Sequence, residues 1–447
     1  MSETDFDIII VGGGITGAAL LYVLSNYTNM KKVLIIEKYS RLATLNSNSR
    51  NNAQTLHFGD IETNYTLEKS KETKKQAELV VQYSKLISRE KRDTIFQKCQ
   101  KMVLGVNEEE IETLHGIKER LKDVFPGLRG IERKELEKLE PYVVKNRPQR
   151  EKVFALLSDN GYMVDFGKLT QSYIENSFGK DRANTHIIFD TKVNDVVKTT
   201  DGYSVITDKR SYKAKFVIYA AGTYSLLFAK RLGYGKNLSI LSVGGNFYIT
   251  KRLLKGKVYR VQKGGIPFAA IHGDPDITDP NINRFGPTVT LPLELERRHN
   301  DVLSYLRTFD FDLQTTQSLF KILFNKDILR IIRKNMFYSV PVFGAHSFLK
   351  NEAQVIVPSL KYSDLKLSKE YGGIRPQIID EKKRALVLGE SKLMGDHIIF
   401  NITPSPGASS ALANALKDVL YIAKDMDLEF NHEKFEKNFG SPISKMM

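Results

Sequence analysis

Cysteine and long apolar runs are what this 447-residue sequence has least of. Its one cysteine, Cys99, excludes a disulfide framework, an iron–sulfur cluster held by several thiolates and a multi-cysteine zinc site, so we expect no metal. No apolar run approaches the roughly 18 residues that span a bilayer, and the acidic start at residues 1–5 lacks the basic region of a signal peptide. We therefore expect a cytoplasmic protein, or one attached to the inner face of the cell membrane.

The charge is strongly basic, with 67 Lys and Arg against 52 Asp and Glu and a net charge of +15. The basic residues are spread over the chain and no nucleic-acid motif is visible, so we expect no nucleic-acid partner. An anionic membrane surface, an acidic small substrate and a merely lysine-rich composition all remain compatible with this charge. The length and the 41% hydrophobic content predict two interleaved domains with a sizeable core.

The N-terminus carries a strand, a glycine turn, a helix start, a second strand and an acid, in that order. The apolar run Ile8–Val11 enters the turn Gly12–Gly17, and a second apolar run, Val33–Ile36, ends on Glu37. This order is typical of an adenine dinucleotide site. In such a site the glycines permit the tight turn and the close approach of a pyrophosphate. The backbone amides at the start of the helix face the negative charge of the pyrophosphate. The acid binds the hydroxyl groups of the ribose. The expected contacts are Gly12, Gly14, Ile15, Thr16, Gly17, Glu37 and Lys38.

Two later segments are predicted to reach the same dinucleotide. The buried strand Lys215–Tyr219 ends on small residues, and ligands of a doubly wound sheet lie at the carboxyl ends of its strands, so Ala221 and Gly222 should contact it. Alternating segments 192–197 and 203–207 predict a small antiparallel element, and its Val193 is expected to contact the dinucleotide as well. Near the C-terminus a helix starts after Pro406 and Gly407, where small residues permit a ligand to approach free amides. Pro406, Gly407, Ala408 and Ser409 are expected there, although a merely capped helix gives the same pattern.

Residues 66–139 read as charged amphipathic helices, with Cys99 as a structural residue in a helical region. Residues 240–375 predict a mixed second domain. The expected domains are a discontinuous nucleotide-binding domain, 1–65, 150–235 and 370–430, and a substrate-binding and helical domain, 66–149 and 236–369.

Together these segments resemble the FAD-dependent oxidoreductases related to D-amino-acid oxidase. The malate:quinone oxidoreductase family has similar segments to the loop Asn51–His57 with the following Ile61–Thr66, to Ile402–Ser409 and to the strand Gly373–Gln377. Ala270–Asp276 is similar to the shorter branch of that family. The resemblance covers Asp7 to about residue 423. The longer branch has a glycine-rich sequence where this chain has Gln54-Thr55-Leu56.

The resemblance implies an α/β fold, with a Rossmann-like FAD-binding domain and an interleaved mixed α+β substrate domain. It implies FAD as cofactor, with Asn52, Ala53 and Gln54 beside the flavin, and a 2-hydroxy dicarboxylate as substrate. The flavin is expected to be noncovalent because no cysteine lies in a flavin motif, with a histidyl link through His57 as the alternative.

Oxidising a 2-hydroxy acid requires a base for the hydroxyl proton and a fixed carboxylate. The planar guanidinium of Arg375 suits a carboxylate, although a structural ion pair is the alternative. Histidine suits proton transfer at neutral pH. We expect His272 to be the base and His57 to orient the substrate or the flavin.

The implied reaction is oxidation of (S)-malate to oxaloacetate through FAD, with a membrane quinone as electron acceptor. The segment Phe320–Lys334 alternates apolar and basic residues at helical spacing, as in an interfacial helix, although a surface helix packed on the core has the same pattern. An L-2-hydroxyglutarate oxidase or dehydrogenase is the enzymatic alternative, because one methylene is worth only about 1–3 kcal/mol of discrimination. A flavin-containing binding protein or an RNA-modifying flavoprotein is the alternative of another class.

Overall fold

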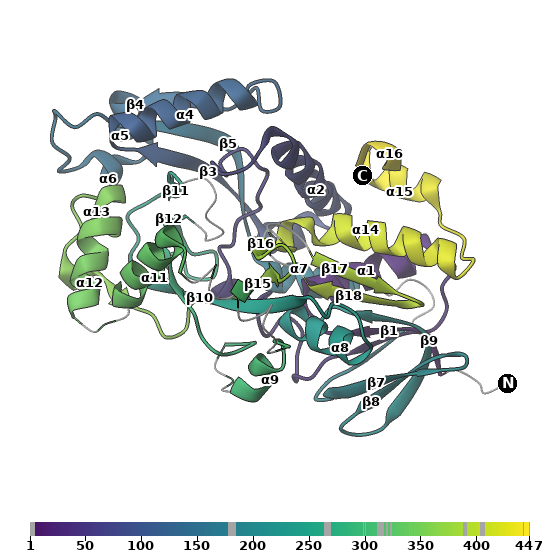
Figure 1. Ribbon diagram of the computed structural model, residues 1–447. Coiled ribbons are helices and arrows are strands. Elements are labelled where there is room, and N and C mark those ends of the chain that lie inside the picture. The colour runs from purple at the N-terminus through teal and green to yellow at the C-terminus, as the bar shows by residue number, and fades with distance from the viewer. Residues whose placement is uncertain are drawn as a thin grey trace.

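The computed structural model describes residues 5–177, 185–262, 270–297, 299, 301–310, 317–318, 321, 324–338, 340, 342–387, 391–402, 407–440 and 442–446. Two sheets organise these residues, with helices packed around them (Figure 1).

The first sheet is the nucleotide-binding sheet expected from the N-terminal motif. Its strands run in the order β17-β18-β9-β1-β2-β6, and the pairs from β18 to β6 are all parallel. The strands are β1 (Phe6–Val11), β2 (Val33–Ile36), β6 (Thr185–Ile188), β9 (Ser211–Tyr219), β17 (Ser391–Gly395) and β18 (Ile398–Ile402). The antiparallel pair β7 (Val193–Thr199) and β8 (Gly202–Thr207) joins it through β9 and confirms the predicted small element.

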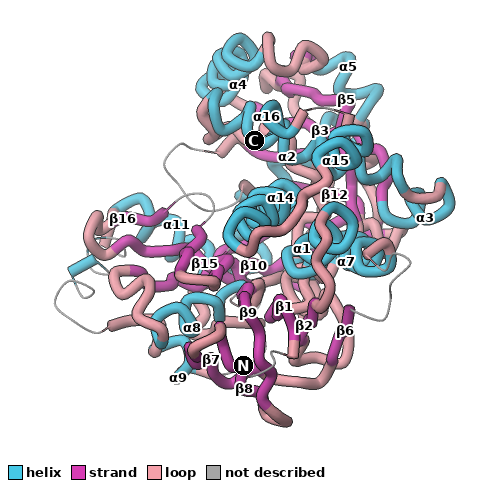
Figure 2. Tube along the Cα trace, turned by 90° about the vertical axis from the view of Figure 1, so that its right-hand side faces the viewer, coloured by secondary structure: helices cyan, strands magenta, loops and turns pink. Residues whose placement is uncertain are grey.

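This sheet is buried on both faces, which explains why β1 is apolar without alternation. Ile8 and Ile10 pack into a core formed with the helices α1 (Ile15–Tyr27), α2 (Leu67–Leu86), α7 (Phe166–Glu175) and α14 (Gly407–Asp425). Ile9 and Val11 pack on the opposite face against β7, β8 and α8 (Ser225–Arg231). Figure 2 shows α1, α7 and α14 on one side of β1 and β2, and β7 and β8 on the other.

The second sheet collects strands from three separated parts of the chain, in the order β16-β15-β10-β13-β12-β11-β3-β5-β4 with β14 beside β10. Its strands are β3 (Phe96–Gly105), β4 (Arg129–Glu132), β5 (Phe154–Val164), β10 (Leu238–Lys251), β11 (Lys257–Arg260), β12 (His272–Pro275), β13 (Ile282–Thr290), β14 (Lys366–Leu367), β15 (Ile374–Asp380) and β16 (Ala385–Val387).

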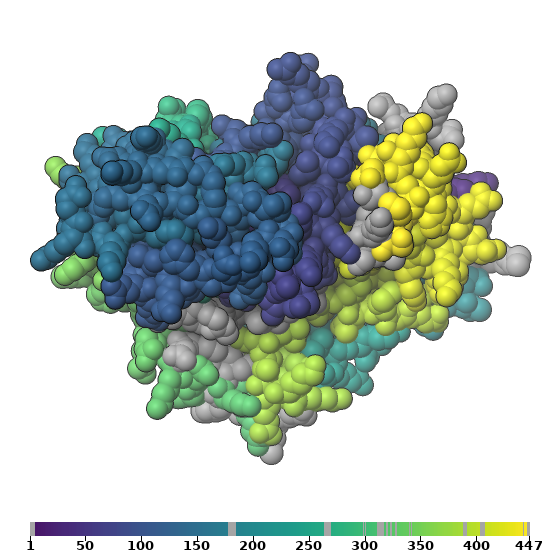
Figure 3. All heavy atoms as spheres, turned by 90° about the horizontal axis from the view of Figure 1, so that it is seen from above, coloured from purple at the N-terminus to yellow at the C-terminus, as the bar shows by residue number. Residues whose placement is uncertain are grey.

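The remaining helices cover the second sheet and the two ends of the molecule. They are α3 (Arg89–Ile95), α4 (Glu108–Leu121), α5 (Arg133–Leu139), α6 (Pro141–Val144), α9 (Val302–Leu306), α11 (Lys326–Tyr338), α12 (Phe343–Phe348), α13 (Gln354–Ile356), α15 (His432–Phe439) and α16 (Ile443–Met446). Seen from above, α4 and α5 lie at one end and α15 and α16 at the other, with α2 between them (Figure 3). Within the described ranges, no helix combines the length and the apolarity needed to cross a membrane.

The structure corrects the expectation of a helical region over 66–139. Two strands, β3 and β4, interrupt the helices there, and Cys99 lies in β3. The reason is tertiary: β3 pairs with β5 and with β11, both distant in sequence, and this pairing overrides local helical character. β5 and β15, which lie within the ranges expected for the nucleotide-binding domain, pair in the second sheet.

We expect Leu20→Ala to lower the free energy of unfolding by about 2–5 kcal/mol, because it opens a cavity in the core that joins α1 to the first sheet. Urea unfolding followed by circular dichroism measures this change. Leu86→Ala, on the exposed part of α2, serves as the control and should change the same free energy by less than about 0.5 kcal/mol. Equal effects of the two substitutions would contradict the assigned core.

Candidate active site

A cavity of about 940 Å³ lies between the two sheets. Its wall includes the turn between β1 and α1, the loop that follows β2, the end of β9, the strand β15 and the start of α14. The first sheet thus contributes the carboxyl ends of its parallel strands, where ligands of open α/β sheets bind.

The glycine turn has the geometry that the motif requires. Gly12 has a φ of +113°, and a Cβ there would lie 2.5 Å from the carbonyl oxygen of Ala220. A Cβ on Gly17 would overlap the carbonyl oxygen of Gly12. The turn therefore closes tightly against both α1 and the end of β9, which leaves the first amides of α1 at the cavity wall.

Glu37 lies at the end of β2, as expected, and its carboxylate braces the turn. Oε2 accepts a hydrogen bond of 2.7 Å from the amide of Gly13, and Oε1 accepts one of 2.9 Å from the amide of Tyr39. Burial raises the pKa of Glu37, while these hydrogen bonds oppose the rise. Its contact with a ribose stays a prediction.

Most of the residues predicted from the sequence line this one cavity. Gly17 packs behind the turn instead of lining the wall, and Pro406 lies outside the described residues. The lining residues among those predicted are Gly12, Gly14, Ile15, Thr16, Glu37, Lys38, Asn52, Ala53, Gln54, His57, Val193, Ala221, Gly222, His272, Arg375, Gly407, Ala408 and Ser409.

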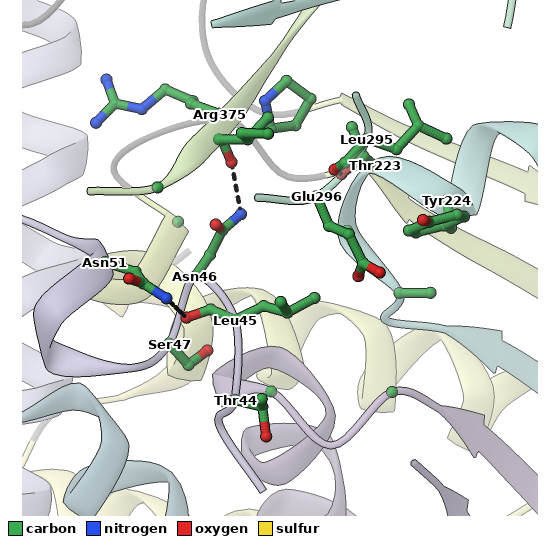
Figure 4. Close-up of a pocket in the computed structure, with 18 of the residues that line it drawn as sticks. Thr44, Leu45, Asn46, Ser47, Asn51, Thr223, Tyr224, Leu295, Glu296 and Arg375 are labelled. Carbon is green, nitrogen blue, oxygen red and sulfur yellow. Dashed lines mark hydrogen bonds between the residues drawn. The ribbon is translucent and has the colours of Figure 1, made fainter. Parts of the chain in front are cut away.

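A polar cluster that the sequence did not indicate adjoins Lys38. The Nζ atom of Lys38 lies 2.5 Å from Oε2 of Glu296, and the hydroxyl of Tyr39 donates a 3.0 Å hydrogen bond to Oε1 of the same carboxylate. Lys38 also lies over the ring of Tyr224, 4.4 Å from its centroid. Figure 4 shows Glu296 and Tyr224 on one side of the pocket and the Arg375 guanidinium extending toward the other. The segment after β13 therefore contacts the residues that follow β2 of the nucleotide-binding sheet.

Arg375 projects from β15 and lines the cavity. Within the described part of the chain, no carboxylate lies within 4 Å of its guanidinium. Burial lowers the pKa of Arg375, while nearby Tyr65 opposes that shift. A partly buried cation without a protein counter-charge favours an anionic ligand, which distinguishes Arg375 from a structural ion pair.

His272 is buried at the start of β12, between the ring of Tyr259, stacked at 4.6 Å, and the edge of Phe247. Its Nδ1 donates a 3.1 Å hydrogen bond to the carbonyl of Ala270. Its Nε2 is buried, lies 3.9 Å from Oδ1 of Asp274, and has no hydrogen-bond partner among the described residues. Burial lowers the pKa of His272 to about 4, although Asp274 opposes the shift. The imidazole is therefore neutral at pH 7.

His57 is held differently. Its Nδ1 lies 2.5 Å from Oε1 of Glu62, and its backbone amide donates a 3.0 Å hydrogen bond to Oγ of Ser409 at the start of α14. His57 thus joins the loop after β2 to the C-terminal return, two segments that the sequence placed beside the same cofactor.

A buried charge cluster fixes the loop that contains Asn52 and Ala53. Oδ2 of Asp274 lies 2.7 Å from Nζ of Lys257 and 2.6 Å from a guanidinium nitrogen of Arg284, and all three side chains are fully buried. Lys257 donates a 2.9 Å hydrogen bond to the carbonyl of Ala53, and Arg284 donates hydrogen bonds to the carbonyls of Asn52 and Ala53. The second sheet therefore holds the cavity-facing loop through its carbonyls.

Gln54 anchors the same loop from its other side. It adopts a φ of +53°, and its side chain donates a 2.8 Å hydrogen bond to Asp276 and accepts one of 2.9 Å from the amide of Ile277. Sequence reasoning placed Gln54 beside the cofactor but missed Asp274, Lys257, Arg284 and Glu62. Asp274 and Glu62 lie in segments that carried the family resemblance, whereas Lys257 and Arg284 had no local signal.

Comparison with known proteins agrees with this geometry. The sequence model of the family "Malate:quinone oxidoreductase (Mqo)" matches residues 4–290. The chain is 38% identical to malate:quinone oxidoreductase from Helicobacter pylori, over 98% of both chains. It is 25% identical to mitochondrial L-2-hydroxyglutarate dehydrogenase from Bos taurus, over 92% of this chain and 87% of that one.

Among solved structures, L-α-glycerophosphate oxidase from Mycoplasma pneumoniae, determined with FAD bound, superposes with a TM-score of 0.62 at 20% identity. The match covers 92% of this chain and 93% of that one. A glycine oxidase from Geobacillus kaustophilus superposes with a TM-score of 0.64 at 16% identity, over 94% of this chain and 95% of that one. These two structures confirm the predicted fold class.

We expect Asp274→Asn to lower the free energy of unfolding by about 3–5 kcal/mol at pH 7, because it leaves Lys257 buried without a counter-charge. Asp159→Asn, at an exposed pair with Arg129, is the control and should cost less than about 1 kcal/mol. Urea unfolding at several pH values measures both.

The pH dependence of this difference has a defined sign. Burial opposes the charge of Asp274, but Arg284 and Lys257 outweigh it and hold the pKa of the carboxyl below its usual range. The stabilisation is therefore present above the pKa of the unfolded state and is lost as the pH falls through the folded value. A difference between wild type and variant that grew toward acidic pH would contradict the ionised cluster.

Proposed function

The chain belongs to the malate:quinone oxidoreductase family, and we propose that it oxidises (S)-malate to oxaloacetate with bound FAD and passes two electrons to a quinone. The much higher identity to the H. pylori enzyme than to the L-2-hydroxyglutarate dehydrogenase favours malate over the longer substrate. The single structural observation that supports the proposal is Arg375, which has no carboxylate counter-charge among the described residues and lies in the cavity that His57 and His272 also line.

The residues at the cavity fit FAD. The Gly12–Gly17 turn leaves the first amides of α1 at the wall, where a pyrophosphate would be held, and Glu37 lies beside it for the ribose. Asn52, Ala53 and the start of α14 would border the flavin. When bound, FAD supplies the acceptor for the C2 hydrogen and its electron pair.

The chain's own residues then orient the substrate and take its proton. Arg375 would hold a substrate carboxylate through paired hydrogen bonds, which fixes C2 relative to the cofactor. One of the two cavity histidines would take the hydroxyl proton, because a neutral imidazole is a suitable base near neutral pH. The flanking aromatic side chains of Phe247 and Tyr259 exclude water around His272.

Replacing Arg375 tests the carboxylate contact. We expect Arg375→Gln to raise the KM for malate about 10–100-fold, since a hydrogen-bonded charge pair contributes about 1.5–3 kcal/mol. Arg375→Lys should recover only part of the loss, because an ammonium cannot form the paired contact. Steady-state kinetics with a soluble quinone analogue measure both, and Arg150→Gln at an exposed site is the control. An unchanged KM in Arg375→Gln would remove Arg375 from the substrate site.

An exposed apolar and basic surface supports docking on a membrane, from which a quinone is reached. On and beside α11 and α12 lie Phe324, Met336, Phe337, Val340, Val342 and Phe343, with exposed fractions from 41% to 72%. The exposed basic residues Lys326, Arg330 and Arg333 lie on the same segment. We propose that this α11–α12 surface docks on the anionic inner face of the cell membrane, with apolar side chains inserted among the lipids.

The docking proposal predicts vesicle binding. Wild-type protein should sediment with phosphatidylglycerol-containing vesicles at low salt, and binding should weaken as salt is raised. The double substitution Phe337→Ser and Phe343→Ser should lower the partition coefficient about 100-fold or more, because two phenylalanine side chains no longer insert. Val197→Ser, at an exposed apolar residue of β7, is the control. Wild-type protein that stays in the supernatant would contradict docking.

A further inference from the structure

We propose that Glu62 is a positioning residue that fixes the imidazole of His57 with Nε2 available to the substrate, so that His57 and not His272 removes the hydroxyl proton. This inference rests on the proposed function, since it names the base of that reaction.

The contact between the two side chains determines which nitrogen of His57 is a base. Oε1 of Glu62 lies 2.5 Å from Nδ1 of His57. An ionised carboxylate only accepts hydrogen bonds, so Nδ1 carries the hydrogen and donates it. In the neutral ring Nε2 then carries the lone pair. His57 lines the cavity, and Nε2 is the ring nitrogen left to contact a ligand there.

The surroundings of Glu62 keep it ionised and in place. Burial opposes its charge, but the hydrogen bond from His57, the charge that His57 gains on protonation and the charge of Lys101 hold the pKa of Glu62 below its usual range. Lys101 is fully buried and its Nζ lies 2.6 Å from Asp60, two residues before Glu62. Lys101, on β3, therefore holds the segment just before Glu62 and places a positive charge near its carboxylate.

The loop that carries the pair is tied at both ends. The amide of His57 is held by Ser409. On the other side of Glu62, Thr63 and Gln262 exchange two hydrogen bonds of 3.0 and 2.9 Å. Both side chains thus sit on backbone that is fixed to neighbouring elements, which is the rigidity that a base and its orienting group require.

Glu62 also lies near the proposed carboxylate ligand. The amide of Tyr65 donates a 3.1 Å hydrogen bond to the carbonyl of Glu62. The hydroxyl group of Tyr65 is close enough to both Glu62 and Arg375 for their charges to affect its pKa, which burial raises. Glu62 and Arg375 therefore both lie near Tyr65, and His57 and Arg375 line the same cavity.

Among the described residues, Nε2 of His272 has no hydrogen-bond partner, but its burial makes it less accessible for the same task. Nδ1 donates to the carbonyl of Ala270, and Nε2 is buried facing Asp274. The rings of Tyr259 and Phe247 pack against the imidazole and hold it in this orientation. This arrangement suits a neutral side chain that shapes the cavity.

The proton transfer balances as follows. The O–H bond of the substrate breaks, and its proton forms an Nε2–H bond on His57. The oxygen electron pair becomes the second bond of the C2 carbonyl as the C2 hydrogen leaves with its electron pair to the bound oxidant. Malate is oxidised by two electrons and the oxidant is reduced by two. The imidazolium that forms is stabilised by the Glu62 carboxylate.

The test is the substitution Glu62→Gln in the holoenzyme, compared with Glu68→Gln on the exposed start of α2. Glutamine retains the size of glutamate but removes its charge. We expect kcat to fall about 100-fold, with a smaller change in KM. The acidic limb of the kcat/KM profile should move to lower pH, because the protonated imidazole loses its counter-charge. Glu68→Gln should match wild type in kcat and in the pH profile of kcat/KM.

Two further measurements separate positioning from folding. Histidine-selective ¹⁵N NMR of the holoenzyme, with the His57 signal identified through His57→Asn, should show hydrogen on Nδ1 in wild type and a mixture of tautomers in Glu62→Gln. Oxaloacetate affinity, followed by flavin absorbance, should be nearly unchanged in Glu62→Gln. His272→Asn should retain the acidic limb of the pH profile.

The outcomes distinguish the two levels of proposal. If malate does not bleach the flavin of wild-type enzyme without oxygen, the proposed function is wrong. If malate bleaches wild type, but Glu62→Gln keeps the acidic limb and tautomer unchanged, the positioning role is overturned. Loss of the acidic limb in His272→Asn, with its retention in His57→Asn, would assign the base to His272 instead.

Discussion

The structure depends on one buried group of charges, in which Asp274 meets Lys257 and Arg284. These side chains belong to β11, β12 and β13 of the second sheet, yet their hydrogen bonds end on the carbonyls of Asn52 and Ala53, which follow the nucleotide-binding motif. Two cations beside the fully buried Asp274 are tolerable because loop carbonyls accept further hydrogen bonds and Asp276 adds a second negative charge, 3.4 Å from Nε of Arg284. Any movement of the loop away from the sheet would leave those cations unsatisfied.

This constraint places the cavity between the sheets and gives its two regions different characters. The first sheet contributes backbone amides, glycines and Glu37, which suit a phosphate-rich cofactor. The second sheet contributes Arg375 from β15 and His272 from β12. The loop that follows β2 contributes His57. Because the loop is fastened to both sheets, the positions of the histidine and of the arginine are set by the same rigid framework.

The two histidines illustrate what environment does to one side-chain type. His272 is enclosed by aromatic rings and has both nitrogens turned toward protein groups, so burial keeps it neutral. His57 has one nitrogen held by a carboxylate and a partly exposed ring at the cavity wall. Sequence reasoning named both residues and favoured His272 as the base, whereas our proposal favours His57, because the fold alone brings their partners, Ala270 and Glu62, to them.

The sequence by itself determined the nucleotide-binding unit, the small antiparallel element and the segments that line the cavity, because glycine turns, strand periodicity and helix starts are local and leave a pattern within a few residues. It did not reveal β3 and β4, the sheet membership of β5 and β15, or the partners of the site residues. Only the tertiary structure decided these, because strand pairing and buried ion pairs join residues far apart in the chain. Lys257 meets Ala53 across about two hundred positions, and no local pattern records that contact.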